Sequence, residues 1–159
     1  LLSFSYSLFA EHPEYFALQP DGTRSTDHVC LSHPDVLSVA IENGRKAILE
    51  CERDSKYIHI GQKDNSNYCQ CENCSALYEK YGSISAPTII FTNAFADALD
   101  DEFPDFKFTF YAYNETDTPP TDLSLKCNDN VIPVICHNSL LKGIFLPYTT
   151  LIAGAMLNV

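Results

Sequence analysis

Glycine and basic residues are both scarce in this sequence. Its six glycines build no Gly-rich phosphate loop and no G-x-S-x-G motif, which excludes the nucleophile elbow of the α/β-hydrolases. Ten lysines and arginines, of which only Arg45 and Lys46 are adjacent, stand against 21 acidic residues, for a net charge of −11. No basic stripe is present to neutralise phosphates, so we expect no nucleic-acid partner. Neutral sugars, cations and small metabolites remain as ligand classes.

The composition is that of a folded domain. Of the 159 residues, 45% are apolar and 19% charged, which is too apolar for a disordered chain. A single domain of this length buries roughly 68–70% of its unfolded surface. The cysteine count of seven is odd, so pairing into disulfides would leave one thiol over. Cysteine usage alone leaves the redox compartment undecided.

Both ends of the chain are apolar. The first ten residues lack a basic region, so they fit the tail of a signal peptide or a first strand. Residues 143–159 carry no charge, but this run is short for a membrane span and contains Pro147. We expect no span there, and instead a buried strand or helix or a truncation scar. The expected organisation is a domain over residues 1–137 and an apolar tail over 138–159.

Between these ends, strand and helix patterns alternate. Strands are predicted at 28–31, 57–61, 106–113 and 131–136, and helices at 32–50 and 86–102, the first with Ser32 as its cap. Strands that alternate with helices of this length indicate βαβ units, and hence an α/β fold with a parallel sheet. The carboxyl ends of such strands meet on one face, where functional residues collect. Cys30 and the segments after Gly61, Tyr113 and Cys136 should therefore share that face.

A C-x-C-x-x-C segment gives the strongest local signal. The thiolates of Cys69, Cys71 and Cys74 can converge on one tetrahedral cation, with a fourth ligand from elsewhere. Cys136 is the expected fourth ligand, and Cys30 and His137 are further candidates on the same face. The prediction is a structural zinc site, because four protein ligands leave no position open for water. Free buried thiols and a disulfide are the alternatives, while an iron–sulfur cluster lacks its usual spacing.

Carboxylates follow two of the predicted strands. Asp64 lies just beyond one strand, with Asn65 and Asn67 beside it, and Glu115 follows the strand that ends at Tyr113. Paired carboxylates suit general acid–base chemistry, and neighbouring amides suit a hydroxyl-rich ligand. A plain turn at 64–67 and a solvated loop charge at Glu115 are the competing interpretations.

Two histidines are harder to assign. His12 is a candidate for substrate contact or a turn residue before Pro13. His59, inside a predicted strand, is interpreted as a hydrogen-bonded core or interface residue.

Several segments in order resemble one bacterial family. They are 11–18 (EHPEYFAL), 21–24 (DGTR), 30–36 (CLSHPDV), 64–74 (DNSNYCQCENC), and Ala112-Tyr113 followed by Pro119-Pro120. This family of unknown function has a glycosidase-like barrel, is frequent in polysaccharide-degrading bacteria, and is related in architecture to α-glucuronidases and β-hexosaminidases. The resemblance covers residues 11–136 and is lost after His137. Glu115 stands where such families usually carry an aromatic residue.

The resemblance implies a (β/α)₈, TIM-barrel-like domain in a secreted or cell-envelope protein that binds or hydrolyses carbohydrate. About four strands are predicted, so the barrel is partial and the chain resembles a truncated copy. In this hypothesis Asp64 and Glu115 are catalytic, Asn65, Asn67 and His12 bind substrate, and the ring of Tyr113 stacks on sugar. The alternative is a non-catalytic carbohydrate-binding or zinc-stabilised α/β module. Unpaired sheet edges would favour self-association.

Overall fold

The computed structural model describes residues 6–50, 55–61 and 63–136. The elements, in chain order, are α1 (Tyr6–Glu11), η1 (Pro13–Tyr15), β1 (Phe16–Leu18), β2 (Arg24–Val29), α2 (Pro34–Leu49), β3 (Tyr57–His59), α3 (Glu72–Tyr81), α4 (Ala86–Asp100), β4 (Lys107–Ala112), η2 (Asn114–Asp117) and β5 (Val131–Ile135). No helix in the described ranges is both long and apolar enough to cross a membrane. The apolar tail lies outside the described residues.

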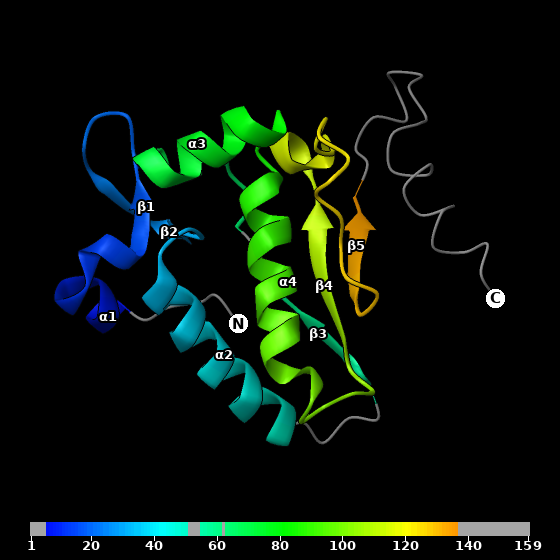
Figure 1. The fold of residues 1–159 in the computed structure, drawn as a ribbon. Helices are drawn as coiled ribbons and strands as arrows, with labels where there is room; N and C mark the ends of the chain where they lie inside the picture. Colours follow the sequence, from blue (N-terminus) through cyan, green and yellow to red (C-terminus); the bar gives the residue numbers. More distant parts are fainter. Residues whose placement is uncertain (1–5, 51–54, 62, 137–159) are drawn as a thin grey trace.

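A parallel sheet confirms the predicted α/β fold class. Its strand order is β3-β4-β5, and both neighbouring pairs are parallel. Helices α3 and α4 connect β3 to β4, which is the crossover expected of a βαβ unit. In Figure 1, α4 lies across this sheet, α2 runs beside α4, and α3 crosses the end of α4.

The first two strands form a separate antiparallel hairpin. β1 pairs with β2, and neither is hydrogen-bonded to the parallel sheet. We expected the strand at 28–31 to belong to the parallel sheet, and this expectation was wrong. Antiparallel strands can be joined by a short turn, and Asp21 caps that turn by accepting from the backbone and side chain of Thr23. The apolar start of the chain is also helical from Tyr6, where a strand was one of the options.

The helices begin where the sequence supplies first-turn residues. Pro34 opens α2, and the cap is His33, whose Nδ1 accepts from the backbone N–H of Asp35. Ser32, the cap expected from the sequence, contacts the cysteines instead. Helix α3 ends at Gly82, which has a φ of 66° and so adopts the left-handed conformation that glycine tolerates best.

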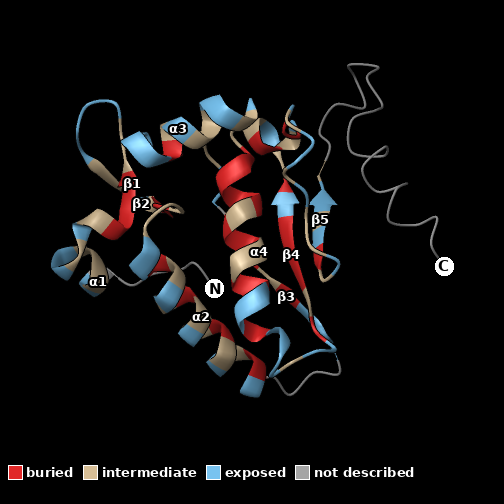
Figure 2. Ribbon diagram, in the orientation of Figure 1, coloured by how far each residue is buried: buried red, intermediate tan, exposed pale blue. Residues whose placement is uncertain are grey.

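The core lies between α4 and the sheet, as the buried faces in Figure 2 show. The ring of Phe95 meets that of Phe108 edge to face, with centroids 5.4 Å apart. This separation lies within the range of about 4.5–7 Å that is usual for aromatic pairs. At Gly44 in α2, an added Cβ would lie only 2.3 Å from Cζ of Phe95. Helix α2 therefore approaches α4 closely because position 44 has no side chain.

On its other face, the sheet carries no helix among the residues that the structure describes. Side chains alternate along a strand, so the register places Tyr57, His59 and Tyr111 on the face opposite Phe108, together with Ile132 and Val134. Tyr57 and Tyr111 are 61% and 41% exposed. This open face and the loops at the carboxyl end of β3 and β4 frame one of the two candidate sites.

Candidate functional site

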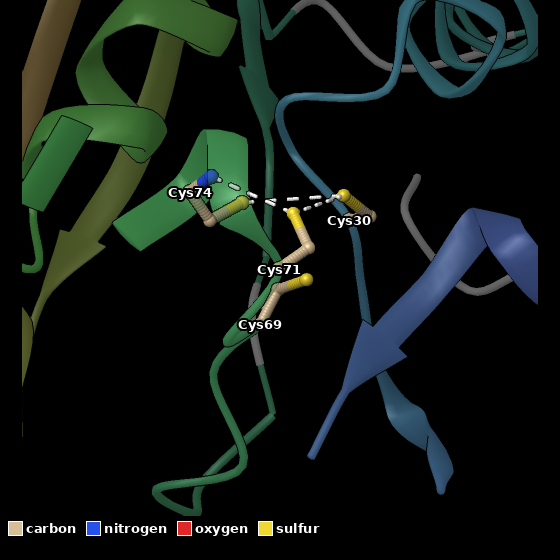
Figure 3. Close-up of side chains that lie close together, drawn as sticks. All are labelled: Cys30, Cys69, Cys71 and Cys74. Carbon is tan, nitrogen blue, oxygen red and sulfur yellow. Dashed lines mark hydrogen bonds between the residues drawn. The ribbon is translucent and has the colours of Figure 1, made fainter. Parts of the chain in front are cut away.

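A cluster of four cysteines forms where the hairpin meets α3. Cys30 directly follows β2, Cys69 lies in the loop before α3, Cys71 is the N-cap of α3, and Cys74 lies in its first turn. Their sulfurs all lie within 4.8 Å of one another. Figure 3 shows the side chains turned toward a common centre, Cys30 from one side and the other three from the opposite side.

The spacing of the sulfurs suits a tetrahedral cation. Sγ of Cys30 lies 3.6 Å from Sγ of Cys71 and 3.9 Å from Sγ of Cys74. A zinc ion with Zn–S bonds of about 2.3 Å needs roughly 3.8 Å between its sulfurs. The four cysteines can therefore hold a metal without large movement.

The pKa values of the clustered thiols depend on the hydrogen bonds between them. Hydrogen bonds from Cys69 and Cys74 hold the pKa of Cys30 well below its ordinary value. The bond to Cys30 raises the pKa of Cys69 to about 11, and the pKa of Cys74 is raised for the same reason. The thiolate of Cys30 is thus stabilised by hydrogen bonds from the neighbouring thiols. A bound cation would stabilise the thiolates of all four cysteines.

Polar contacts around the cluster fix its geometry. The backbone N–H of Leu18 donates to Sγ of Cys69 at 3.3 Å, and the backbone N–H of Gln70 donates to the carbonyl of Leu18. The hydroxyl of Ser32 lies 3.1 Å from Sγ of Cys74. Such outer contacts orient ligands in metal sites, and here they tie β1 to the cysteine loop.

The predicted convergence of three cysteines is observed, and their role as metal ligands stays a prediction. Cys69, Cys71 and Cys74 converge, but the fourth member is Cys30 and not Cys136. Cys136 follows β5, where its backbone N–H donates to the carbonyl of Ala112. None of the cysteines in the described ranges forms a disulfide. His137 lies outside those ranges.

A cavity of about 230 Å³ adjoins the cluster. Cys69 and Cys74 form part of its wall, and the remainder includes His28, Ile60, Phe91 and Thr92. The hydroxyl of Thr92 is buried and has no hydrogen-bond partner. The cavity therefore lies between the hairpin, the segment that follows β3, α3 and α4, and its lining is mixed polar and apolar.

The second candidate site lies at the carboxyl end of β3 and β4. Nδ2 of Asn114 donates to Oδ1 of Asp64 at 3.2 Å, and the hydroxyl of Ser66 donates to Oε1 of Glu115. These two bonds join the loop after β3 to η2 after β4, so both predicted carboxylates lie at one end of the sheet. Asn114 has a φ of 52°, a conformation that residues other than glycine adopt mainly where surrounding contacts enforce it.

Asn65 and Asn67 hold the same loop against the hairpin. Oδ1 of Asn65 accepts from Nε2 of His28 and from the backbone N–H of Asn67, both at 2.9 Å. Nδ2 of Asn67 donates to Oδ2 of Asp27. These bonds give both amides a structural role beyond the predicted contact with substrate. Burial also lowers the pKa of His28.

The remaining predicted substrate residues lie in different surroundings. Tyr113 directly follows β4 and caps η2, next to the carboxylate loops. Nδ1 of His12 lies 3.0 Å from Oε1 of Glu14, and its ring stacks on Tyr15 with centroids 4.6 Å apart. The structure therefore places Tyr113 at the sheet end and binds His12 into the η1 turn.

Sequence reasoning did not identify His59 as a site residue. Its Nε2 is buried without a hydrogen-bond partner, and its ring lies 4.0 Å from the ring of Tyr111. The alternation of β3 was the available signal, because it places His59 and Tyr57 on the face that no helix covers within the described part of the chain.

The fold and these residues define the class as a βαβ domain with a four-cysteine centre beside a sheet end that carries carboxylates. Residues 3–148 match the domain of unknown function DUF4838, and the chain belongs to that family. Membership of a family of unknown function is thus confirmed, and the match continues past residue 136, where the motifs end.

Two further comparisons were made. No curated protein sequence matches the chain. Among solved structures, the chain is similar to a beta-N-acetylhexosaminidase from Bacteroides fragilis NCTC 9343, with 18% sequence identity and a TM-score of 0.49. The likeness covers 80% of this chain and 23% of that protein, so the chain spans about a quarter of its length.

Proposed function

We propose that this chain is part of a carbohydrate-active, glycoside-hydrolase-like protein whose carboxylates are Asp64 and Glu115. The observation that carries the proposal is the pair of bonds from Asn114 to Asp64 and from Ser66 to Glu115. They hold two carboxylates on adjacent loops at the carboxyl end of a parallel sheet, where such folds bind ligands.

The two carboxylates would act as the acid and base of glycoside hydrolysis. Retaining enzymes separate these groups by about 5–5.5 Å and inverting enzymes by about 6.5–9.5 Å. Tyr113, at the same end of β4, is proposed as the surface on which a sugar ring stacks. Asn65, Asn67 and His12 stay predictions as substrate contacts, and so does a secreted or cell-envelope location.

An activity screen tests this proposal. Purified full-length chain is offered a panel of aryl glycosides, and Asp64→Asn and Glu115→Gln are compared with the wild type. Asp105→Asn, which removes an exposed carboxylate before β4, is the matched control. Turnover that either site variant abolishes and the control retains supports the proposal. Turnover that survives both site variants contradicts the assignment of these carboxylates.

We further propose that the cysteine centre holds a structural zinc ion. Four thiolates satisfy the tetrahedral preference of zinc and leave no open position for a catalytic water. Since Asp64 and Cys69 lie in one loop, the ion would brace the loop that carries the carboxylate. Elemental analysis of the purified chain should find one zinc per chain, and a stoichiometry near zero after purification with added zinc would refute the site.

Measurements of zinc content and of turnover distinguish the proposed enzyme from the alternative function. Zinc without turnover or sugar binding favours the alternative function, a zinc-stabilised α/β module without catalysis. Turnover abolished by Asp64→Asn favours the enzyme, whether or not zinc is present.

A further inference from the structure

Two buried acceptor atoms without partners belong to the same end of the sheet. They are Nε2 of His59 and Oε2 of Glu115, and in the described ranges only the Thr92 hydroxyl joins them as a buried, unpartnered side-chain polar atom. Buried polar groups in folded proteins are nearly always hydrogen-bonded, so each exception calls for an unseen partner. A bound ligand is one such partner.

The hydrogen bonds of His59 indicate which ring nitrogen carries the proton. Nδ1 lies 3.0 Å from Oγ1 of Thr109, and that hydroxyl is directed at the carbonyl of Ile58, 3.5 Å away. A hydroxyl has one proton, so a Thr109 hydroxyl that donates to Ile58 must accept from Nδ1–H. Nε2 is then an unprotonated acceptor. Burial also lowers the pKa of His59, which favours the neutral ring.

The ring of His59 lies toward the carboxyl end of β3. A Cβ added at Gly61 would lie 3.4 Å from Cδ2 and 3.5 Å from Nε2 of His59. The ring edge formed by Cδ2 and Nε2 therefore lies next to Gly61. The ring packs against Tyr111 on the open face of the sheet. Nε2 therefore lies near the start of the loop that carries Asp64.

With the proton of His59 on Nδ1, the two buried atoms without partners at this end of the sheet are both acceptors. Glu115 uses Oε1 to accept from Ser66 and keeps Oε2 without a donor. Asp64 contributes a further carboxylate, which accepts from Asn114. A ligand that complements this set must supply hydrogen-bond donors. A cation is not indicated here, since the cysteines are the only group in the described ranges whose ligand atoms converge for a metal.

We propose that His59 is a ligand-binding residue, whose Nε2 accepts a hydrogen bond from a sugar hydroxyl while Oε2 of Glu115 accepts a second. The exposed ring of Tyr111 lies beside His59 and supplies apolar contact for the sugar face. This inference rests on the proposed carbohydrate function and specifies how the sugar is recognised: through hydroxyl donors that face a neutral imidazole and a carboxylate.

The test begins with the tautomer of His59 in the wild-type chain. Long-range ¹H–¹⁵N correlation spectra should show Nδ1 protonated and Nε2 bare. The chain is then titrated with a panel of methyl pyranosides, and the sugar that binds should shift the Nε2 resonance. A protonated Nε2 in the neutral ring, or an Nε2 resonance unmoved by a sugar that binds elsewhere, would overturn the inference.

Variants add an affinity measurement. His59→Phe keeps a ring against Tyr111 but removes the acceptor, and losing one neutral hydrogen bond should weaken binding about three- to tenfold. Tyr57→Phe, at the opposite end of β3, is the control and should bind like the wild type. Deoxy analogues of the bound sugar complete a double-mutant cycle: the analogue that lacks the contacted hydroxyl loses affinity for the wild type but not for His59→Phe.

These experiments distinguish a failure of the carbohydrate function from a failure of the role proposed for His59. If no methyl pyranoside binds the wild type, the carbohydrate function and this inference both fail. If a sugar binds and His59→Phe binds it equally well, the carbohydrate function stands and the role of His59 is refuted.

Discussion

Replacing Cys30 by serine should uncouple the hairpin from α3 and cost the chain its zinc. Cys30 is the one cysteine of the cluster that comes from the hairpin side, 41 residues before Cys71. A metal ion bound by both segments acts as a cross-link that restricts the unfolded chain. The chain-entropy relation for a cross-link closing 41 residues gives about 4 kcal/mol.

This energy predicts a measurable change in thermal stability. One kcal/mol shifts the midpoint of a domain this size by about 2–4 °C, so Cys30→Ser should melt about 8–16 °C below the zinc-loaded wild type. A chelator should lower the wild type by a similar amount and leave Cys30→Ser almost unchanged. Thermal unfolding followed by circular dichroism, with zinc measured on the same samples, provides the data.

Cys136→Ser is the matched control, because Cys136 is a free cysteine outside the cluster. It should keep the zinc stoichiometry and melting temperature of the wild type. The reasoning is refuted if Cys30→Ser retains one zinc per chain and its full melting temperature. It is refuted equally if Cys136→Ser is the variant that loses the metal.

Three further predictions concern packing and charge. Gly44→Ala should destabilise the chain by about 1–2 kcal/mol in urea unfolding, because overpacking against Phe95 outweighs the gain of about 1 kcal/mol in helix propensity. A stabilised variant would contradict this, and so would a loss of stability that is equally large when Phe95 is replaced by leucine. Thr92→Val should stabilise the chain by about 1 kcal/mol, since it removes a buried hydroxyl without a partner at nearly constant volume, and a loss of stability would show that the hydroxyl is bonded. The hydrogen bonds from Arg45 lower the pKa of Glu102. The ionised carboxylate therefore stabilises the fold above the ordinary carboxyl pKa, and this stabilisation is lost as the pH falls through the lowered pKa. The difference in stability between the wild type and Glu102→Gln should vanish on acidification, and a difference that grows at low pH would contradict the predicted direction of the pH dependence.

Local patterns predicted α2, α4 and the parallel sheet well, but neither α1 nor α3 was predicted. Pro34 and the apolar spacing after it specify α2, and an apolar face likewise specifies α4. The aromatic run before Tyr113 identifies β4, whose neighbours are the strands next to it in the chain. These features depend on residues close in sequence, so a single sequence contains the information.

The hairpin was missed, and Cys30 was named only as an alternative to Cys136, for the opposite reason. β1 spans only Phe16–Leu18, too few residues to show a period, and its pairing with β2 depends on the turn at Asp21. Because β2 leaves the parallel sheet, its end approaches the cysteine loop directly, and Cys30 displaces Cys136 as the fourth member. His59 was missed because an orphaned atom is a property of packing, which sequence spacing does not reveal.

The split origin of the cysteine cluster also bears on how the protein matures. Cys30 leaves the ribosome, or an export channel, well before Cys71 and Cys74, and the cluster is complete only when both segments have emerged and folded together. Until then its thiols are open to oxidants, and two sulfurs that come within 3.6 Å in the folded chain are placed to cross-link wrongly when no metal separates them. With the proposed zinc ion as the ligand of the cluster, metal supply and oxidant would therefore compete during synthesis, and the yield of correctly assembled protein should depend on which arrives first.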